Sequence, residues 1–164
     1  MRLVVDTSVL VGELLRAAGR ARLADERLDL FIAEHALDEV HYELPRRARR
    51  YAARHGVPPE DIQRLVQACF EAIETNVTTI HSAAYSPNEG EARWRSDRDP
   101  HDWPTVAAAM TVDAAVWIED GDFLGTGVAT WTSTTVQAWL MRQPGRRIRP
   151  AVPGVGRFCS GARS

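Results

Sequence analysis

Four acidic residues, far apart in the sequence, could together carry out metal-assisted chemistry. They are Asp6, Glu39, Asp102 and Asp120. Carboxylates that come within a few ångströms of one another must either protonate or share a cation. Mg²⁺ and Mn²⁺ take oxygen ligands and keep bound waters that can attack a phosphodiester in line. The four acids therefore predict a metal-dependent phosphodiesterase, provided that the fold brings them together.

The chain contains no lysine, which excludes several other chemistries. A Walker A lysine, a Schiff-base lysine and the lysine of receiver-type phosphorylation switches are all ruled out. A zinc site is also not expected, because the histidines lack ligand spacing and cysteine companions. Those histidines are His35, His41, His55, His81 and His101. Carboxylates, hydroxyls and arginines remain as the candidate functional groups.

Five short apolar segments are typical of strands, and they must position the acids. They span residues 2–6, 29–33, 77–81, 114–118 and 128–132. Helical patterns lie between them, and the strand–helix alternation predicts a parallel sheet with helices on both faces.

The helices are expected to begin and end at recognisable residues. The first runs from a cap at Thr7-Ser8 to a break at Gly19, and the second starts near Leu37 and kinks or restarts at Pro45. Later helices begin at 58–59, at 102–104 and at a Ser133 cap, the last ending near Met141. Residues 85–101 are polar and contain proline and glycine, so they predict a loop that has room for a short helix.

Ligands of open α/β sheets bind beyond the carboxyl ends of the strands. Asp6 ends the first strand, Glu39 lies in the first turn of the helix after the second, and Asp120 follows the fourth. Asp102 reaches this edge only if its helix points its N-terminus toward it. Taken singly, Asp102 could be a helix cap, Glu39 a solvated residue and Asp120 part of a turn.

Three segments, together with Glu39, resemble the PIN-domain ribonucleases. Residues 4–10 (VVDTSVL) are similar to the family's opening strand, Asp and Thr-Ser. Residues 99–109 (DPHDWPTVAAA) resemble its Asp-Pro-x-Asp-x-Pro segment before an alanine-rich helix. Residues 116–124 (VWIEDGDFL) resemble the strand and Asp-x-Asp turn that closes its site. The order and spacing hold over roughly residues 2–142.

The resemblance implies an α/β/α sandwich around a five-stranded parallel sheet, a PIN-like, Rossmann-like fold. It implies an endoribonuclease specific for single-stranded RNA that uses Mg²⁺ or Mn²⁺. The implied catalytic and metal-binding residues are Asp6, Glu39, Asp102 and Asp120, with Asp122 as an additional or substitute metal ligand. Many bacterial members are toxins of toxin–antitoxin modules (the VapC type), often homodimeric and inhibited by a small antitoxin protein.

The chain departs from the family at Ile118, where a serine or threonine commonly supports a carboxylate. A PIN-like scaffold that binds RNA or a protein without cutting is therefore an alternative. A phosphatase of Rossmann-like topology is a weaker one, because Asp6 is followed by Thr7-Ser8 rather than by a second Asp, and no lysine is present.

Substrate contacts are expected from Thr7, Arg95 and Arg98. The net charge of −2 gives no overall nucleic-acid signature, so local basic segments must attract the phosphates. The arginines before Asp102 rank first because they lead directly into it. The arginine-rich stretch 46–54 ranks second, and the basic tail beyond Gln143 third.

At 164 residues, the chain fits one nuclease domain (1–142) followed by a basic, flexible tail (143–164). It shows no apolar run long enough to span a membrane and no signal peptide. Cys69 and Cys159 lie too far apart for a CxxC pair and are read as thiols in a reducing compartment. A cytoplasmic location is the expectation.

Overall fold

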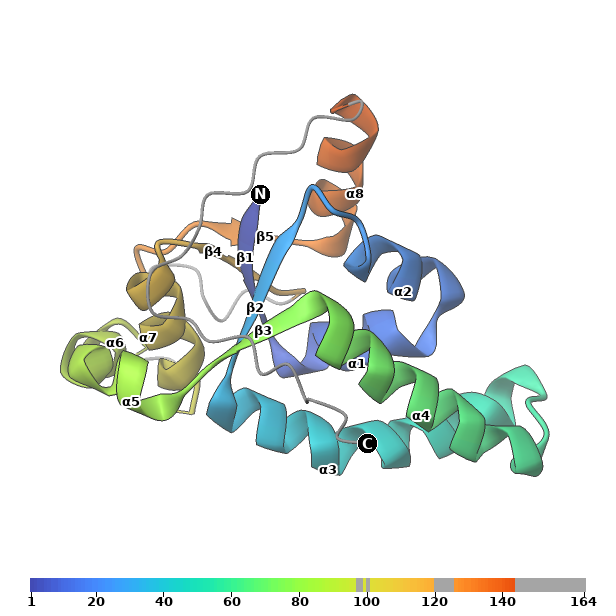
Figure 1. Cartoon of the computed structure of the whole chain (residues 1–164). Helices are drawn as coiled ribbons and strands as arrows, with labels where there is room; N and C mark the ends of the chain where they lie inside the picture. Colours follow the sequence, from blue (N-terminus) through green and yellow to red (C-terminus); the bar gives the residue numbers. More distant parts are fainter. Residues whose placement is uncertain (97–98, 100, 120–125, 144–164) are drawn as a thin grey trace, which may run out of the picture.

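The computed structural model describes residues 1–96, 99, 101–119 and 126–143 (Figure 1). In chain order the elements are β1 Arg2–Val5, α1 Thr7–Leu15, α2 Ala17–Leu23, β2 Asp29–Ala33, α3 Glu34–His55, α4 Pro59–Asn76, β3 Val77–Ile80, α5 Ser82–Tyr85, η1 Ser86–Asn88, α6 Glu89–Arg95, α7 Trp103–Val112, β4 Ala115–Trp117, β5 Thr130–Trp131 and α8 Ser133–Arg142. No helix among these is both long and apolar enough to cross a membrane.

The strands form one parallel sheet in the order β3-β2-β1-β4-β5. Leu3 of the central strand pairs with Leu30 on one side and Ala115 on the other. Figure 1 shows α5, α6 and α7 on one side of the sheet and α1, α2 and α4 on the other. The predicted α/β/α sandwich around five parallel strands is confirmed.

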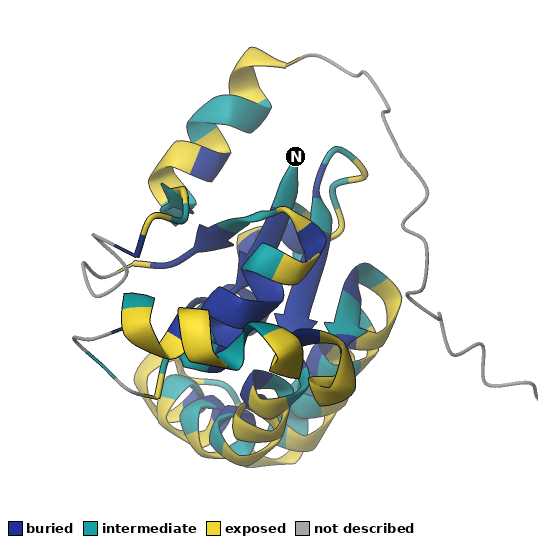
Figure 2. Cartoon of the chain, turned by 90° about the vertical axis from the view of Figure 1, so that its left-hand side faces the viewer, coloured by how far each residue is buried: buried dark blue, intermediate teal, exposed yellow. Residues whose placement is uncertain are grey.

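The core consists of the strands and the inner faces of the helices that cover them (Figure 2). Leu3, Val4 and Val5 are completely buried, as expected for a central parallel strand with helices on both faces. Cys69 is also buried, and its thiol donates to the Leu14 carbonyl oxygen at 3.3 Å. Burial raises the pKa of this thiol.

The segment 85–101, expected to be a loop with room for a short helix, contains the 3-10 turn η1 and the seven-residue helix α6, which together occupy Ser86 to Arg95. Ion pairs at i,i+4 support α6, from Glu89 to Arg93 at 2.7 Å and from Glu91 to Arg95 at 2.9 Å. These pairs help to explain why a segment with little apolar periodicity forms a helix.

The first helical segment breaks at Arg16, not at Gly19 as predicted. Arg16 has extended backbone angles, φ −104° and ψ 133°, and Gly19 lies inside α2. A Cβ at Gly19 would lie 2.1 Å from the Glu13 carbonyl oxygen. The glycine therefore serves close packing of α2 against α1 rather than helix termination.

Two further helix predictions need correction. Helix α3 begins at Glu34 and continues through Pro45 as one element. A buried stripe spaced by four residues runs on both sides of the proline and holds the helix together. That stripe consists of Ala36, Val40, Leu44, Ala48 and Ala52. The cap of α8 is Thr132, which forms a capping box with Thr135.

Arg27 joins the two ends of the described chain. Its guanidinium donates to the carbonyl oxygens of Leu140, at 2.7 Å, and Gln143, at the end of α8. Its own carbonyl oxygen accepts from the Met1 amino group at 2.5 Å. This junction precedes β2 and therefore lies at the amino edge of the sheet.

Candidate active site at the carboxyl edge of the sheet

Asp6 lies between the ends of two central strands. It follows β1 directly, and its backbone N–H donates to the carbonyl oxygen of Trp117, the last residue of β4, at 3.0 Å. Its side chain caps α1, with Oδ2 accepting from the Ser8 N–H at 2.9 Å and from the Ser8 hydroxyl at 2.6 Å. Both of these hydrogen bonds use Oδ2, so neither of them occupies the second oxygen, Oδ1.

Glu39 comes to the same edge through a contact between α1 and α3. The buried Thr7 hydroxyl donates to the Ala36 carbonyl oxygen at 3.3 Å, which fastens the start of α1 to the first turn of α3. Glu39 is exposed and lies one turn beyond Ala36. Thr7 therefore positions the segments that carry two of the acids, and its contact with substrate stays a prediction.

Asp102 lies at the carboxyl edge of the sheet because of the direction of α7. Helix α7 leads into the amino end of β4, so its N-terminus, which Asp102 precedes, points to the carboxyl edge of the parallel sheet. Asp102 is half-buried and occupies the N-cap position, but its side chain makes no capping hydrogen bond. The cap of α1 is therefore Asp6 and not Thr7-Ser8 as predicted, and Asp102 does not cap α7 through its side chain.

The remaining predicted residues are placed less fully. Asp120, Asp122 and Arg98 lie outside the described residues. Ile118 is described and almost completely buried, with its N–H donating to the Trp131 carbonyl oxygen at 2.8 Å. It therefore belongs to the core at the position where the family commonly carries a hydroxyl.

The donor set at this edge fits a hard divalent cation in its chemistry. Asp6, Glu39 and Asp102 offer only carboxylate oxygens, which Mg²⁺ and Mn²⁺ prefer over nitrogen or sulfur. Within the described ranges, no three His, Cys, Asp or Glu side chains are close enough to hold a metal ion. The described acids therefore share an edge without forming a closed ligand cage.

A second acidic contact at this edge was missed by the sequence interpretation. The Glu34 carboxylate is 3.0 Å from His81 Nδ1 and accepts from the Ser82 N–H at 2.8 Å. Hydrogen bonding to His81, followed by that to Ser82, lowers the pKa of Glu34 to about 2. The available signal was positional, since Glu34 directly follows β2 and His81 directly follows β3. This contact ties α3 to the end of β3.

We expect the Glu34 contact to make stability depend on acid pH. Its folded-state pKa of about 2 lies below the ordinary 4.5, so its stabilisation is complete above about pH 4.5 and is lost as pH falls toward 2. The carboxylate is 39% exposed, which limits the effect to about 1 kcal/mol or less. Urea unfolding of wild type and Glu34→Gln should differ at pH 6 by about this amount. A difference that grows as pH falls would contradict the assignment.

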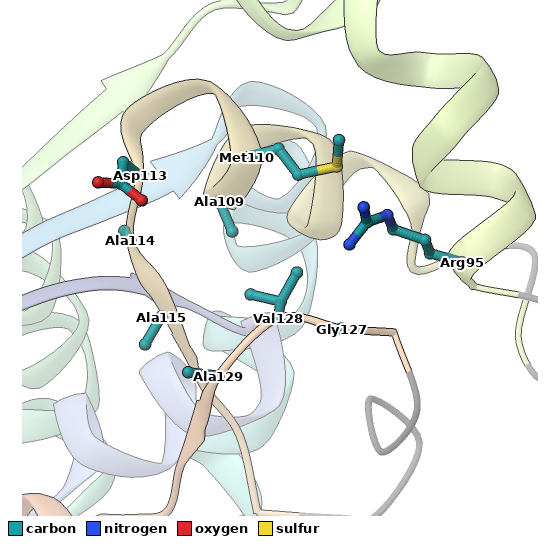
Figure 3. Close-up of a pocket in the computed structure, with 9 residues that line it drawn as sticks. All are labelled: Arg95, Ala109, Met110, Asp113, Ala114, Ala115, Gly127, Val128 and Ala129. Carbon is teal, nitrogen blue, oxygen red and sulfur yellow. The ribbon is translucent and has the colours of Figure 1, made fainter.

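Arg95 is not placed beside these acids. Its guanidinium pairs with Glu91 at 2.9 Å and donates to the Thr126 carbonyl oxygen at 3.1 Å. It borders a pocket of about 310 Å³ at the C-terminal half of α7 (Figure 3). The pocket lining is Arg95, Ala109, Met110, Asp113, Ala114, Ala115, Gly127, Val128 and Ala129. Asp102 stands at the opposite end of the same helix, about 15 Å away along its axis.

Arg93 is the arginine of α6 that lies near the N-terminus of α7. Its guanidinium carbon is 4.7 Å from the centre of the Trp103 ring, and that ring packs edge-on against Tyr85 at 5.8 Å. Trp103 directly follows Asp102. The contact between Arg93 and Trp103 was not predicted from the sequence, because it forms only when α6 packs against α7.

Residues 4–141 of this chain match the model of a protein family, the PIN domain. No curated protein matches the chain significantly.

Proposed function

Because this chain belongs to the PIN domain family, whose members are generally nucleases that use divalent metals, we propose that it is a metal-dependent endoribonuclease that hydrolyses single-stranded RNA. The observation that carries the proposal is the meeting of three acid-bearing elements at one sheet edge. These are the β1–α1 junction with Asp6, the second turn of α3 with Glu39, and the start of α7 with Asp102.

In this proposal Asp6, Glu39, Asp102 and Asp120 hold Mg²⁺ or Mn²⁺, with Asp122 as an additional ligand. The bound cation would supply charge neutralisation at the phosphate and a water of lowered pKa. The chain's own residues orient the ligands. Ser8 fixes the Asp6 carboxylate through two hydrogen bonds to Oδ2, and Thr7 holds α1 against α3 so that Glu39 stays at the edge.

We further propose, on the resemblance alone, that the protein is the toxin of a bacterial toxin–antitoxin module. A homodimer held in check by a small antitoxin is the expected arrangement, in the cytoplasm. Residues 1–142 would form the nuclease and residues 143–164 a basic appendage.

The test is cleavage of labelled single-stranded RNA by the purified chain. We expect cutting with Mg²⁺ or Mn²⁺, full loss with EDTA and recovery when the metal is added in excess. A double-stranded RNA of the same sequence should be cut far more slowly. Undiminished cleavage in EDTA would overturn the metal mechanism. No cleavage under any condition would favour the alternative of a PIN-like scaffold that binds RNA or a protein without cutting. That alternative is motivated by Ile118, which lacks the hydroxyl commonly found at this position.

A further inference from the structure

The outer surface of α3 carries a row of residues that starts at a candidate metal ligand. Glu39, Tyr42, Arg46 and Arg49 are spaced by three, four and three residues, so they share one face of the helix. This face, termed here the α3 strip, lies opposite the buried stripe that packs on the core, and all four residues are exposed.

Tyr42 and Arg46 form an aromatic platform on this strip. Tyr42 is 58% exposed, one of the few large apolar side chains that the described residues leave in solvent. The Arg46 guanidinium carbon lies 3.6 Å from the centre of the Tyr42 ring. A ring held by a stacked guanidinium on an exposed helix face is suited to stacking an unpaired base.

The arginines of this helix divide into two groups. Arg47 and Arg50 approach the Glu43 carboxylate at 3.4 and 4.0 Å. Arg46 and Arg49 take part in none of the ion pairs found in the described part of the chain. Their charges are therefore not neutralised by a neighbouring carboxylate and are available to phosphates.

We propose that the α3 strip binds the single-stranded RNA that flanks the cut, with Tyr42 stacking a base and Arg46 and Arg49 contacting phosphates. The inference rests on the proposed function, since the RNA bound by the strip would be the RNA that the acidic edge cuts. Along the helix axis, Arg46 lies about 10 Å and Arg49 about 15 Å from Glu39. An edge rich in carboxylates repels RNA, so adjoining positive charge must supply the affinity.

The strip fits RNA better than an acidic protein segment. Carboxylates of a peptide would use the guanidinium groups but gain little from the tyrosine ring, whereas unpaired bases use both. The sequence ranked the arginines before Asp102 first as phosphate-binding residues, and the structure changes this order. Arg95 is bound to Glu91 and to the Thr126 carbonyl oxygen near the C-terminal end of α7, whereas Arg46 and Arg49 lie on the same helix as Glu39.

The test measures binding separately from cutting. Fluorescence anisotropy with a labelled single-stranded RNA of about 12 nucleotides is run on the full chain in EDTA. Arg46→Glu with Arg49→Glu should weaken binding roughly tenfold or more and flatten the slope of log K against log salt by about 1.4. The matched control is Arg64→Glu with Arg142→Glu, which changes the net charge equally on exposed positions of α4 and α8. The control should bind close to wild type.

Stacking is tested by a second pair of variants. Tyr42→Ala should weaken binding about fivefold or more, whereas Tyr42→Phe should keep near-wild-type affinity because the ring is retained. Circular dichroism checks that each variant is folded.

The outcomes separate this inference from the proposed function. Equal losses in both double variants, or unchanged binding by Tyr42→Ala, would overturn it. The inference would also be overturned if a strip variant lost binding of labelled poly-glutamate but kept its RNA binding, because the surface would then bind an acidic protein. RNA binding through the strip by a chain that never cuts with Mg²⁺ or Mn²⁺ would support the strip and overturn the nuclease.

Discussion

Glu13→Gln is expected to lower the free energy of unfolding by about 3–5 kcal/mol, because it breaks a buried charge network. Glu13 lies on α1 and is completely buried. Its carboxylate is 2.6 Å from Arg16, pairs with Arg22 and accepts from the Ser133 hydroxyl at 3.2 Å. The neutral amide would leave the Arg22 guanidinium, itself 15% exposed, without its counter-ion.

Urea unfolding at neutral pH measures the effect. Glu74→Gln, the same change at an exposed position of α4, is the control and should stay within about 0.5 kcal/mol of wild type. Combining Glu13→Leu with Arg22→Met should cost less than the sum of the single variants, because both buried charges are then removed. A Glu13→Gln loss below about 1 kcal/mol would show that the network does not hold α1, α2 and α8 together.

Asp6→Asn and Asp102→Asn are each expected to reduce RNA cleavage at least about 100-fold, while leaving stability nearly unchanged. Each change removes a proposed metal ligand without changing side-chain size. Asparagine caps helices as well as aspartate does, so α1 should keep its cap in Asp6→Asn. Asp102 makes no side-chain capping bond, so α7 loses none.

Two controls separate chemistry from structure. Asp113→Asn makes the same change at the other end of α7, where φ is +49° and asparagine is well tolerated, and it should cut RNA like wild type. Ser8→Ala removes a hydrogen bond to Asp6 but keeps its carboxylate, so cleavage should fall much less than in Asp6→Asn. Single-turnover rates and thermal melts are measured for all four. If Asp113→Asn lost as much activity as Asp102→Asn, the proposed role of Asp102 would fail.

The architecture could be predicted from the sequence because its strands are nearly continuous apolar runs. Residues 2–6 and 29–33 correspond closely to β1 and β2, and strand–helix alternation fixed the parallel sheet. The errors arose where tertiary contacts override local patterns. Gly19 looks like a helix stop but is required by packing against Glu13, and Pro45 is tolerated because burial continues beyond it.

The candidate site could be predicted only in part. Asp6 was indicated by its position at a strand end, and Glu39 and Asp102 by their positions near the start of a helix. The fold brings the three elements that carry them to one edge. Two features depended on contacts between separate elements, which local sequence patterns do not predict. One is the Glu34–His81 pair, 47 residues apart, and the other is the contact of Arg93 with Trp103.

The Arg27 junction has a practical consequence for how the protein can be tethered. It gathers Met1 and Gln143 at the amino edge of the sheet, whereas Asp6, Glu39 and Asp102 occupy the carboxyl edge. A surface anchor attached through a cysteine placed at Gln143, in a Cys159→Ser background, would therefore present the acidic edge to solution. Immobilised protein should then bind RNA with the same affinity as free protein, which makes surface-based binding measurements suitable for the α3 variants.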